Sequence, residues 1–234
     1  MTILYEDNHI IAVNKTCNEI VQGDKTGDVP LSEMVKSYIK DKYHKPGEVF
    51  LGVTHRLDRP TSGVVLFART SKALARLNEM FRSHTQIRKT YWAIVEHPER
   101  LKKEGERLED YLVRNEKLNK SFVGRGGGAE GRGAEGRHGE AEGQRAVLSY
   151  KPLGYGEHYA LVEVELETGR HHQIRCQMAH IGCPIKGDLK YGARRSNKDG
   201  GICLHARRIQ FTHPVSHVDI DITAPAPNEF NLYL

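Results

Sequence analysis

The fold is expected to be organised around one stretch of sequence, HRLDRPTSGVVLFA at residues 55–68. Its first part places Asp58 between two arginines and then supplies turn residues, because Pro60 fixes its own φ and disfavours a helical conformation for Arg59. Gly63 tolerates backbone angles that other residues resist. The apolar run that follows is typical of a buried strand. Asp58 should therefore lie on a rigid loop leading into a core strand, although an ion-paired surface loop has the same composition.

Length, charge and cysteine usage restrict the class of protein. A length of 234 residues is typical of a single domain. The net charge of +5 is compatible with a polyanionic partner, although many ordinary proteins have a similar charge. The N-terminus lacks the basic and apolar segments of a signal peptide, and no apolar run approaches the ~18 residues that a membrane span needs. Four irregularly spaced cysteines without a Cys-x-x-Cys motif argue against a disulfide framework. We therefore expect a cytoplasmic protein without membrane association.

Apolar periodicity predicts a chain with more strands than helices. Alternation or short apolar runs predict strands over 3–5, 9–13, 64–68, 88–95, 108–113, 145–150, 159–166 and 218–222. A helical period predicts helices over 31–43 and 71–84 and another that ends near residue 181, with Ser32 and Ser71 as N-caps of the first two. This order favours the α+β class, and Lys15 is predicted to be a solvated lysine in the loop after the second strand.

Residues 124–144 differ from the rest of the chain in composition. They contain nine glycines, with arginines and glutamates nearly in balance. Such a segment buries too little apolar surface to offset the entropy of ordering it, so we predict a flexible insertion between strands. An RNA-binding tether is the alternative, and the glutamates argue against it.

A metal site is one interpretation of residues 172–183. His172, Cys176, His180 and Cys183 recur at helical spacing on roughly one face. Four ligands strung along one helix would span about 16 Å at 1.5 Å per residue. A tetrahedral site gathers its ligands around a single ion. We therefore predict no metal here.

Three motifs, in this order, resemble the RluA-like family of pseudouridine synthases: HRLDRPTSG at 55–63, KTYWA at 89–93 and TGRHHQIR at 168–175. The resemblance extends from about residue 3 to residue 227 apart from the insertion, and no N-terminal accessory RNA-binding domain of the kind that some relatives carry is expected. It implies the pseudouridine synthase fold, an α+β fold in which a largely antiparallel mixed sheet is flanked by helices and crossed by a basic active-site cleft. In the loop after the second strand, Thr16 and Asn18 stand where the family has proline and glycine.

The resemblance also implies roles for three residues at the reaction centre. Asp58 corresponds to the catalytic carboxylate, and Arg175 to the arginine that pairs with it. A cleft arginine can hold a carboxylate and keep it ionised. Tyr91 corresponds to the tyrosine that lies against the target uracil, although alternation alone favours a core or edge aromatic.

Three further basic residues are expected to contact RNA. The resemblance implies that Arg56 fills the space left by the flipped base. Arg59 and Lys89, which belong to the same motifs, are predicted to bind RNA as well.

The expected function is isomerisation of specific uridines in ribosomal or transfer RNA to pseudouridine by a single catalytic domain, with no cofactor and as a monomer. The uridine must leave its stack to be reached, which is least costly in a loop. Two alternatives remain. A non-catalytic RNA-binding protein of the same fold would have lost Asp58, Tyr91 or Arg175. A glycosidase would need a second carboxylate, such as Glu165 or Asp188.

Overall fold

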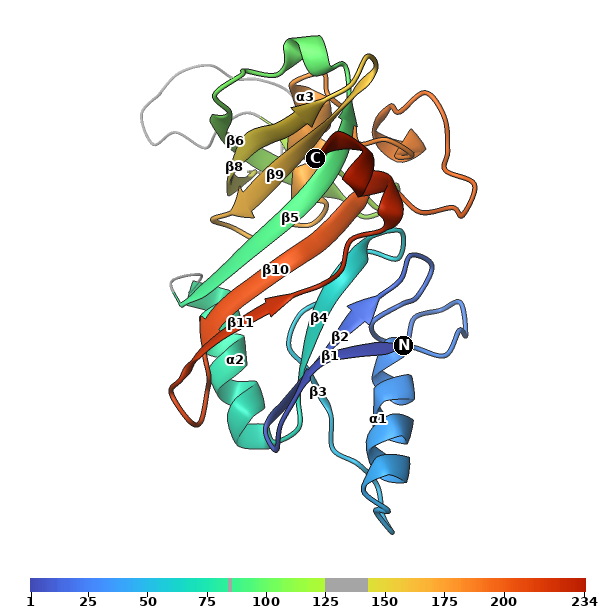
Figure 1. Ribbon diagram of the computed structural model, residues 1–234, viewed down its shortest axis with the longest axis vertical. Helices are drawn as coiled ribbons and strands as arrows, with labels where there is room; N and C mark the ends of the chain where they lie inside the picture. The colour runs from blue at the N-terminus through green and yellow to red at the C-terminus, as the bar shows by residue number, and fades with distance from the viewer. Residues whose placement is uncertain (84–85, 125–142) are drawn as a thin grey trace, which may run out of the picture.

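The computed structural model describes residues 1–83, 86–124 and 143–234. Within these residues, eleven strands form one mixed sheet in the order β1-β2-β4-β10-β5-β9-β8-β6-β7, with β11 beside β10 and β3 beside β4 (Figure 1). Most pairs are antiparallel, and β4 and β10 are parallel. The strands are β1 (Thr2–Glu6), β2 (Ile10–Lys15), β3 (Gly52–Val53), β4 (Ser62–Ala68), β5 (Ile87–Glu96), β6 (Glu106–Asn115), β7 (Lys120–Gly124), β8 (Gln144–Tyr155), β9 (Tyr159–Leu166), β10 (Leu204–Thr212) and β11 (Asp219–Thr223). The predicted α+β class is confirmed.

The strands follow the sequence patterns closely where alternation is strong. The strand predicted over 159–166 has those bounds in the structure, while the strands predicted over 108–113 and 145–150 are both longer at both ends. β7 was not predicted, because its short sequence lies in a charge-rich region and does not alternate over enough residues. Residues 125–142, which make up most of the predicted flexible insertion, lie outside the described residues.

Three helices contribute to the fold: α1 (Leu31–Lys42), α2 (Ser71–Ser83) and α3 (Gln173–His180), among the residues that the structure describes. Both predicted serine caps are wrong. Ser32 is buried inside α1, which begins after Pro30 with no side-chain cap, because proline already fixes an extended conformation there. In α2 the cap is Thr70, whose Oγ1 accepts a hydrogen bond from the Ala73 amide at 3.2 Å. None of the helices in the described ranges is long and apolar enough to cross a membrane.

Two main hydrophobic cores lie along the sheet. The first packs α1 and α2 against β2 and β4, toward the lower end of the molecule in Figure 1. The second packs α3 against β5, β8 and β9, toward the upper end. Tyr91 on β5 packs against both cores, so its position marks the junction between them.

The junction depends on a close approach of β4 to β10 at Gly63. The two strands pair over only two residue pairs, one of which joins Gly63 to Ala206. Gly63 has a φ of +118°, and a Cβ at this position would lie 2.4 Å from both the backbone N and the backbone O of Ala206. Only glycine avoids both the strained angle and the clash. The contact holds the loop that carries Asp58 against the central strands.

We expect Gly63→Ala to lower the free energy of unfolding by at least about 2 kcal/mol, since it adds backbone strain and forces β4 away from β10. Urea unfolding followed by circular dichroism measures the change. Gly23→Ala is the matched control, because a Cβ there meets nothing within 4 Å, and its effect should stay within about 1 kcal/mol. Equal effects for the two variants would contradict the proposed role of the close approach.

Candidate active site

The loop that carries Asp58 is fixed at both ends by its own motif. The Thr61 amide donates a hydrogen bond to the Asp58 carbonyl at 3.0 Å and closes the turn that begins at Asp58. His55 Nε2 accepts a hydrogen bond from the Leu66 amide at 3.0 Å, and its ring stacks on Phe81. Burial, followed by the nearby charge of Lys89, lowers the pKa of His55 to about 3, so the ring is neutral and can accept this bond. The loop is therefore rigid before any substrate binds.

The side chain of Lys15 contacts the backbone of the same loop. The prediction that Lys15 is a solvated loop lysine is therefore wrong. Its side chain is buried, with 1% of its surface exposed. Its Nζ donates to the carbonyls of Thr61 at 2.6 Å, Arg59 at 3.0 Å and Asp58 at 3.3 Å. Burial lowers its pKa to about 8. Its burial cannot be recognised from its own position in sequence, because three of its carbonyl partners come from more than 40 residues away.

Arg175 connects Asp58 to a second carboxylate. Its Nε and Nη2 bind the two oxygens of Asp188 at 2.7 Å and 2.9 Å, and its Nη1 donates to Asp58 Oδ2 at 3.0 Å. Arg175 and Asp188 are both buried, whereas the Asp58 side chain keeps 32% of its surface exposed. A buried guanidinium held in this way has little freedom to move, so it offers Asp58 a fixed positive partner.

His172 also contacts Asp58. Its Nε2 lies 3.4 Å from Asp58 Oδ2, and its Nδ1 lies 3.1 Å from the hydroxyl of Tyr191. The residue precedes α3 with a left-handed backbone, at φ 52° and ψ 28°. Burial is the main cause that lowers the pKa of His172 to about 3. The imidazole beside the aspartate is therefore neutral at physiological pH.

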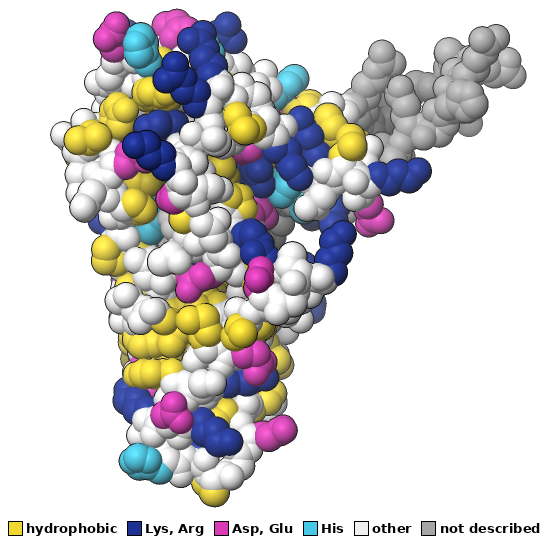
Figure 2. Space-filling model, turned by 90° about the vertical axis from the view of Figure 1, so that its right-hand side faces the viewer, with side chains coloured by type: hydrophobic (Ala, Val, Ile, Leu, Met, Phe, Trp, Pro, Cys, Tyr) yellow, Lys and Arg dark blue, Asp and Glu magenta, His cyan; other side chains and the backbone are white. Residues whose placement is uncertain are grey.

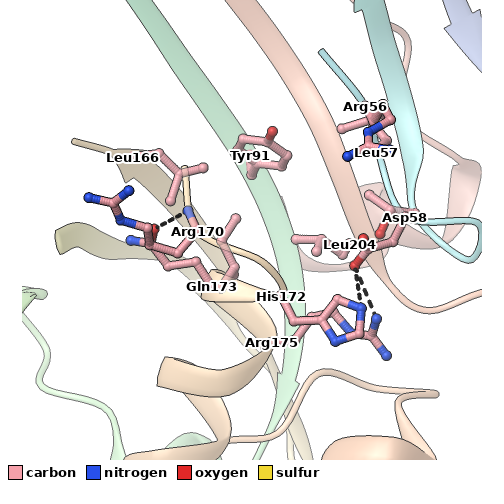
Figure 3. Close-up of a pocket in the computed structure, with 12 residues that line it drawn as sticks. Arg56, Leu57, Asp58, Tyr91, Leu166, Arg170, His172, Gln173, Arg175 and Leu204 are labelled. Atoms are coloured by element: carbon pink, nitrogen blue, oxygen red, sulfur yellow. Dashed lines mark hydrogen bonds and ion pairs between the residues drawn. The ribbon is translucent and has the colours of Figure 1, made fainter. Parts of the chain in front are cut away.

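Asp58, Tyr91 and Arg175, the three residues expected at the reaction centre, line one pocket of about 90 Å³ (Figure 3). Arg56 and Arg170 also line it, so arginines outnumber the single carboxylate. Burial, and then the charge of Asp58, raises the pKa of Tyr91, which stays protonated. The pocket thus combines a partly exposed carboxylate, an aromatic ring and an excess of positive charge, as the capture of a nucleotide requires.

Comparison with known proteins agrees with this geometry. The sequence profile described as RNA pseudouridylate synthase matches residues 9–180. The chain belongs to the RNA pseudouridylate synthase family. It is 32% identical to a tRNA pseudouridine synthase C of Vibrio parahaemolyticus over 244 aligned positions, which cover 96% of this chain and 89% of the relative. It is 33% identical to an uncharacterised RNA pseudouridine synthase of Bacillus subtilis, covering 97% and 69%. The structure of human RNA pseudouridylate synthase domain containing 4 has the same fold, with a TM-score of 0.77 at 24% identity and coverage of 98% and 90%.

The expected resemblance to RluA-like pseudouridine synthases and the expected enzyme class are thereby confirmed. The family motifs that lie far apart in sequence meet in the pocket: HRLDRPTSG supplies Asp58, KTYWA supplies Tyr91, and TGRHHQIR supplies Arg175. The expected contact between Arg175 and Asp58 is present. The catalytic roles of the three residues stay predictions.

The three predicted RNA contacts have different surroundings in this synthase. Arg56 is exposed at the pocket. Arg59 forms an ion pair with Asp28 at 2.6 Å. Lys89 is buried, and burial lowers its pKa to about 8. Arg56 is thus the one of the three best exposed for contact with RNA, and all three roles stay predictions.

The charge on one side of the synthase is unevenly distributed. Figure 2 shows Lys and Arg side chains concentrated on the upper half of that face. Such a concentration attracts a phosphate backbone and makes binding depend on salt.

The four residues considered as metal ligands do not converge on one point. His172 faces Asp58, and the Cys176 thiol donates to the Ser121 carbonyl at 3.3 Å. Cys183 lies beyond the end of α3 in the second core, and His180 is exposed. Within residues 1–83, 86–124 and 143–234, no three histidine, cysteine or acidic side chains are grouped closely enough to bind a metal.

Sequence reasoning missed the positions of Lys15, His172 and Tyr191 in this site. His172 lies inside the TGRHHQIR motif, so the motif itself was a signal that its imidazole faces the aspartate. Neither Tyr191 nor Lys15 could be placed in the site from local patterns, because each reaches it through contacts with segments distant in sequence.

We expect Lys15→Met to reduce kcat at least tenfold. The substitution removes the ammonium group from the loop carbonyls, and small displacements of reacting groups are costly in rate. Buried carbonyls left without a donor should also lower the free energy of unfolding by about 1–3 kcal/mol. Steady-state kinetics and urea unfolding measure both effects. The control is Lys36→Met, which removes only an exposed ion pair with Glu33. We expect its kcat to stay within twofold of the native value. A tenfold fall in kcat for Lys36→Met as well would contradict this explanation.

Proposed function

We propose that this synthase isomerises a uridine in transfer RNA to pseudouridine, with Asp58 as the catalytic carboxylate. The observation that carries the proposal is the placement of Asp58 between Arg175 and the open pocket, with Tyr91 on the same pocket wall. A carboxylate held beside a fixed guanidinium can act as a nucleophile or a base. The choice of transfer RNA is supported by several relatives named tRNA pseudouridine synthase C.

The proposed reaction breaks the glycosidic bond, rotates the base and joins it to the sugar through C5. Asp58 assists at the sugar or the base, and the hydrogen at C5 leaves as a proton after the carbon–carbon bond forms. The uridine would be flipped from a loop into the pocket, with Tyr91 against the uracil and Arg56 in the vacated space. We propose that one monomeric catalytic domain performs this in the cytoplasm.

A glycosidase is not favoured by the surroundings of the two other carboxylates. Asp188 is buried and bound on both oxygens by Arg175. Glu165 is paired with Arg88 on a strand. Neither is presented to the pocket opposite Asp58, where a second carboxylate would be needed.

The test is tritium release from RNA labelled at uracil C5, since forming pseudouridine expels that hydrogen. Unmodified transcripts of transfer RNA and of ribosomal RNA are compared with the native protein. Release from transfer RNA alone is expected. Release from ribosomal RNA alone would contradict the proposal that transfer RNA is the substrate. RNA binding without release from either would favour the non-catalytic RNA-binding protein.

A further inference from the structure

The two ring nitrogens of His172 face different groups, one in a hydrogen bond and one at ion-pair distance. Nδ1 faces the hydroxyl of Tyr191 at 3.1 Å, while Nε2 faces Asp58 Oδ2 at 3.4 Å. A neutral imidazole carries one proton and accepts at the other nitrogen, so the partners decide which tautomer is present. The second partner, a carboxylate, can only accept when it is ionised.

The surroundings of Tyr191 favour one of the two tautomers of His172. Its hydroxyl oxygen accepts a hydrogen bond from the Ser121 amide of β7 at 2.8 Å. With that acceptor position occupied, the hydroxyl proton is available for His172 Nδ1. Tyr191 is buried and its ring also contacts His172 edge-on, with centroids 5.7 Å apart. A hydroxyl that accepts from the Ser121 amide and donates to Nδ1 satisfies both partners, and in that arrangement the imidazole proton is on Nε2.

The rest of the environment holds the imidazole in this state. The His172 side chain is 5% exposed, and burial lowers its pKa to about 3. The ring of His171 stacks on it with centroids 3.8 Å apart. The left-handed backbone of His172 is an uncommon conformation for a non-glycine residue, and such positions are frequent at functional sites.

We propose that His172, fixed by Tyr191 as the neutral tautomer with its proton on Nε2, is a positioning residue that donates to Asp58 Oδ2 and so presents Oδ1 to the uridine. Arg175 Nη1 binds the same Oδ2 at 3.0 Å. Among the described residues, no side chain hydrogen-bonds Oδ1. Two donors on one oxygen fix the carboxylate plane and leave the other oxygen as the reacting atom. This inference rests on the proposed role of Asp58.

The tautomer is measured first, on the native protein without RNA. Long-range nitrogen–proton NMR of the ¹⁵N-histidine protein distinguishes a protonated ring nitrogen from an accepting one, and the His172 signals are assigned from their loss in His172→Gln. We expect Nδ1 as the acceptor and Nε2 as the protonated nitrogen. In Tyr191→Phe, which keeps the ring but removes the hydroxyl, we expect a mixture of tautomers. A proton on Nδ1 in the native protein would overturn the proposal.

Kinetics on transfer RNA then separates positioning from structural support. His172→Asn keeps an acceptor toward Tyr191 but is too short to donate to Asp58, and we expect kcat to fall at least tenfold while KM stays within threefold. His172→Gln places an amide donor near the position of Nε2 and should recover kcat to within about fivefold of native. Equal kcat values for His172→Asn and the native protein would overturn the proposal. If the native protein releases no tritium, the proposed function fails, and the tautomer measurement still decides the hydrogen-bond network.

Discussion

Asp58→Asn is expected to abolish tritium release, lowering kcat by at least about 1,000-fold. An amide has nearly the same shape as a carboxylate but is neither a nucleophile nor a base, so the substitution removes the chemistry and little else. Arg175 keeps its two bonds to Asp188 in the variant. We therefore expect the free energy of unfolding to change by less than about 1 kcal/mol, and RNA affinity to stay within a few-fold.

The comparison variant is Asp41→Asn, the same chemical change on the exposed surface of α1. It should release tritium at the native rate. Filter binding and urea unfolding on both variants separate loss of chemistry from loss of RNA binding or of the fold. Substantial release by Asp58→Asn would show that another group performs the reaction.

Arg175→Met is expected to be both inactive and strongly destabilised. The substitution leaves the carboxylate of Asp188, which is 1% exposed, without its bidentate partner. Removing one member of a buried ion pair typically costs about 3–5 kcal/mol, because the remaining charge stays desolvated. Asp58 also loses the cation that lies 3.0 Å from Oδ2. Urea unfolding and tritium release measure the two losses separately.

The double variant Arg175→Met/Asp188→Asn separates these two effects of Arg175. Removing the charge of Asp188 should restore at least half of the lost stability, because no unpaired charge remains buried. Activity should not return, since Asp58 still lacks its cation. A double variant as unstable as Arg175→Met would show that packing, and not charge, explains the destabilisation.

Local patterns in the sequence predicted much of this fold. Alternation located β9 at its observed bounds, and the apolar run after Asp58 located β4. The predictions of the two helix caps were wrong for a local reason. A serine near the start of a helix is a candidate N-cap, but in the structure the N-cap positions are occupied by Pro30 and Thr70. The order of β4, β10 and β5 side by side could not be read from the sequence, because pairing partners separated by more than 100 residues leave no periodic signal in a single chain.

For the site, the sequence by itself determined the residue types and the order of the three motifs, and through their resemblance to a family it indicated Asp58, Tyr91 and Arg175. Only the tertiary structure decided what surrounds them. In the folded chain, Lys15 is buried against the carbonyls of the Asp58 loop, and Arg175 is hydrogen-bonded to Asp188. The fold also brings His172 against the carboxylate. Periodicity and spacing describe neighbours along the chain, whereas burial and hydrogen bonding depend on segments that meet only when the sheet has formed. These contacts set the surroundings and the orientation of the residues that we propose to act in catalysis.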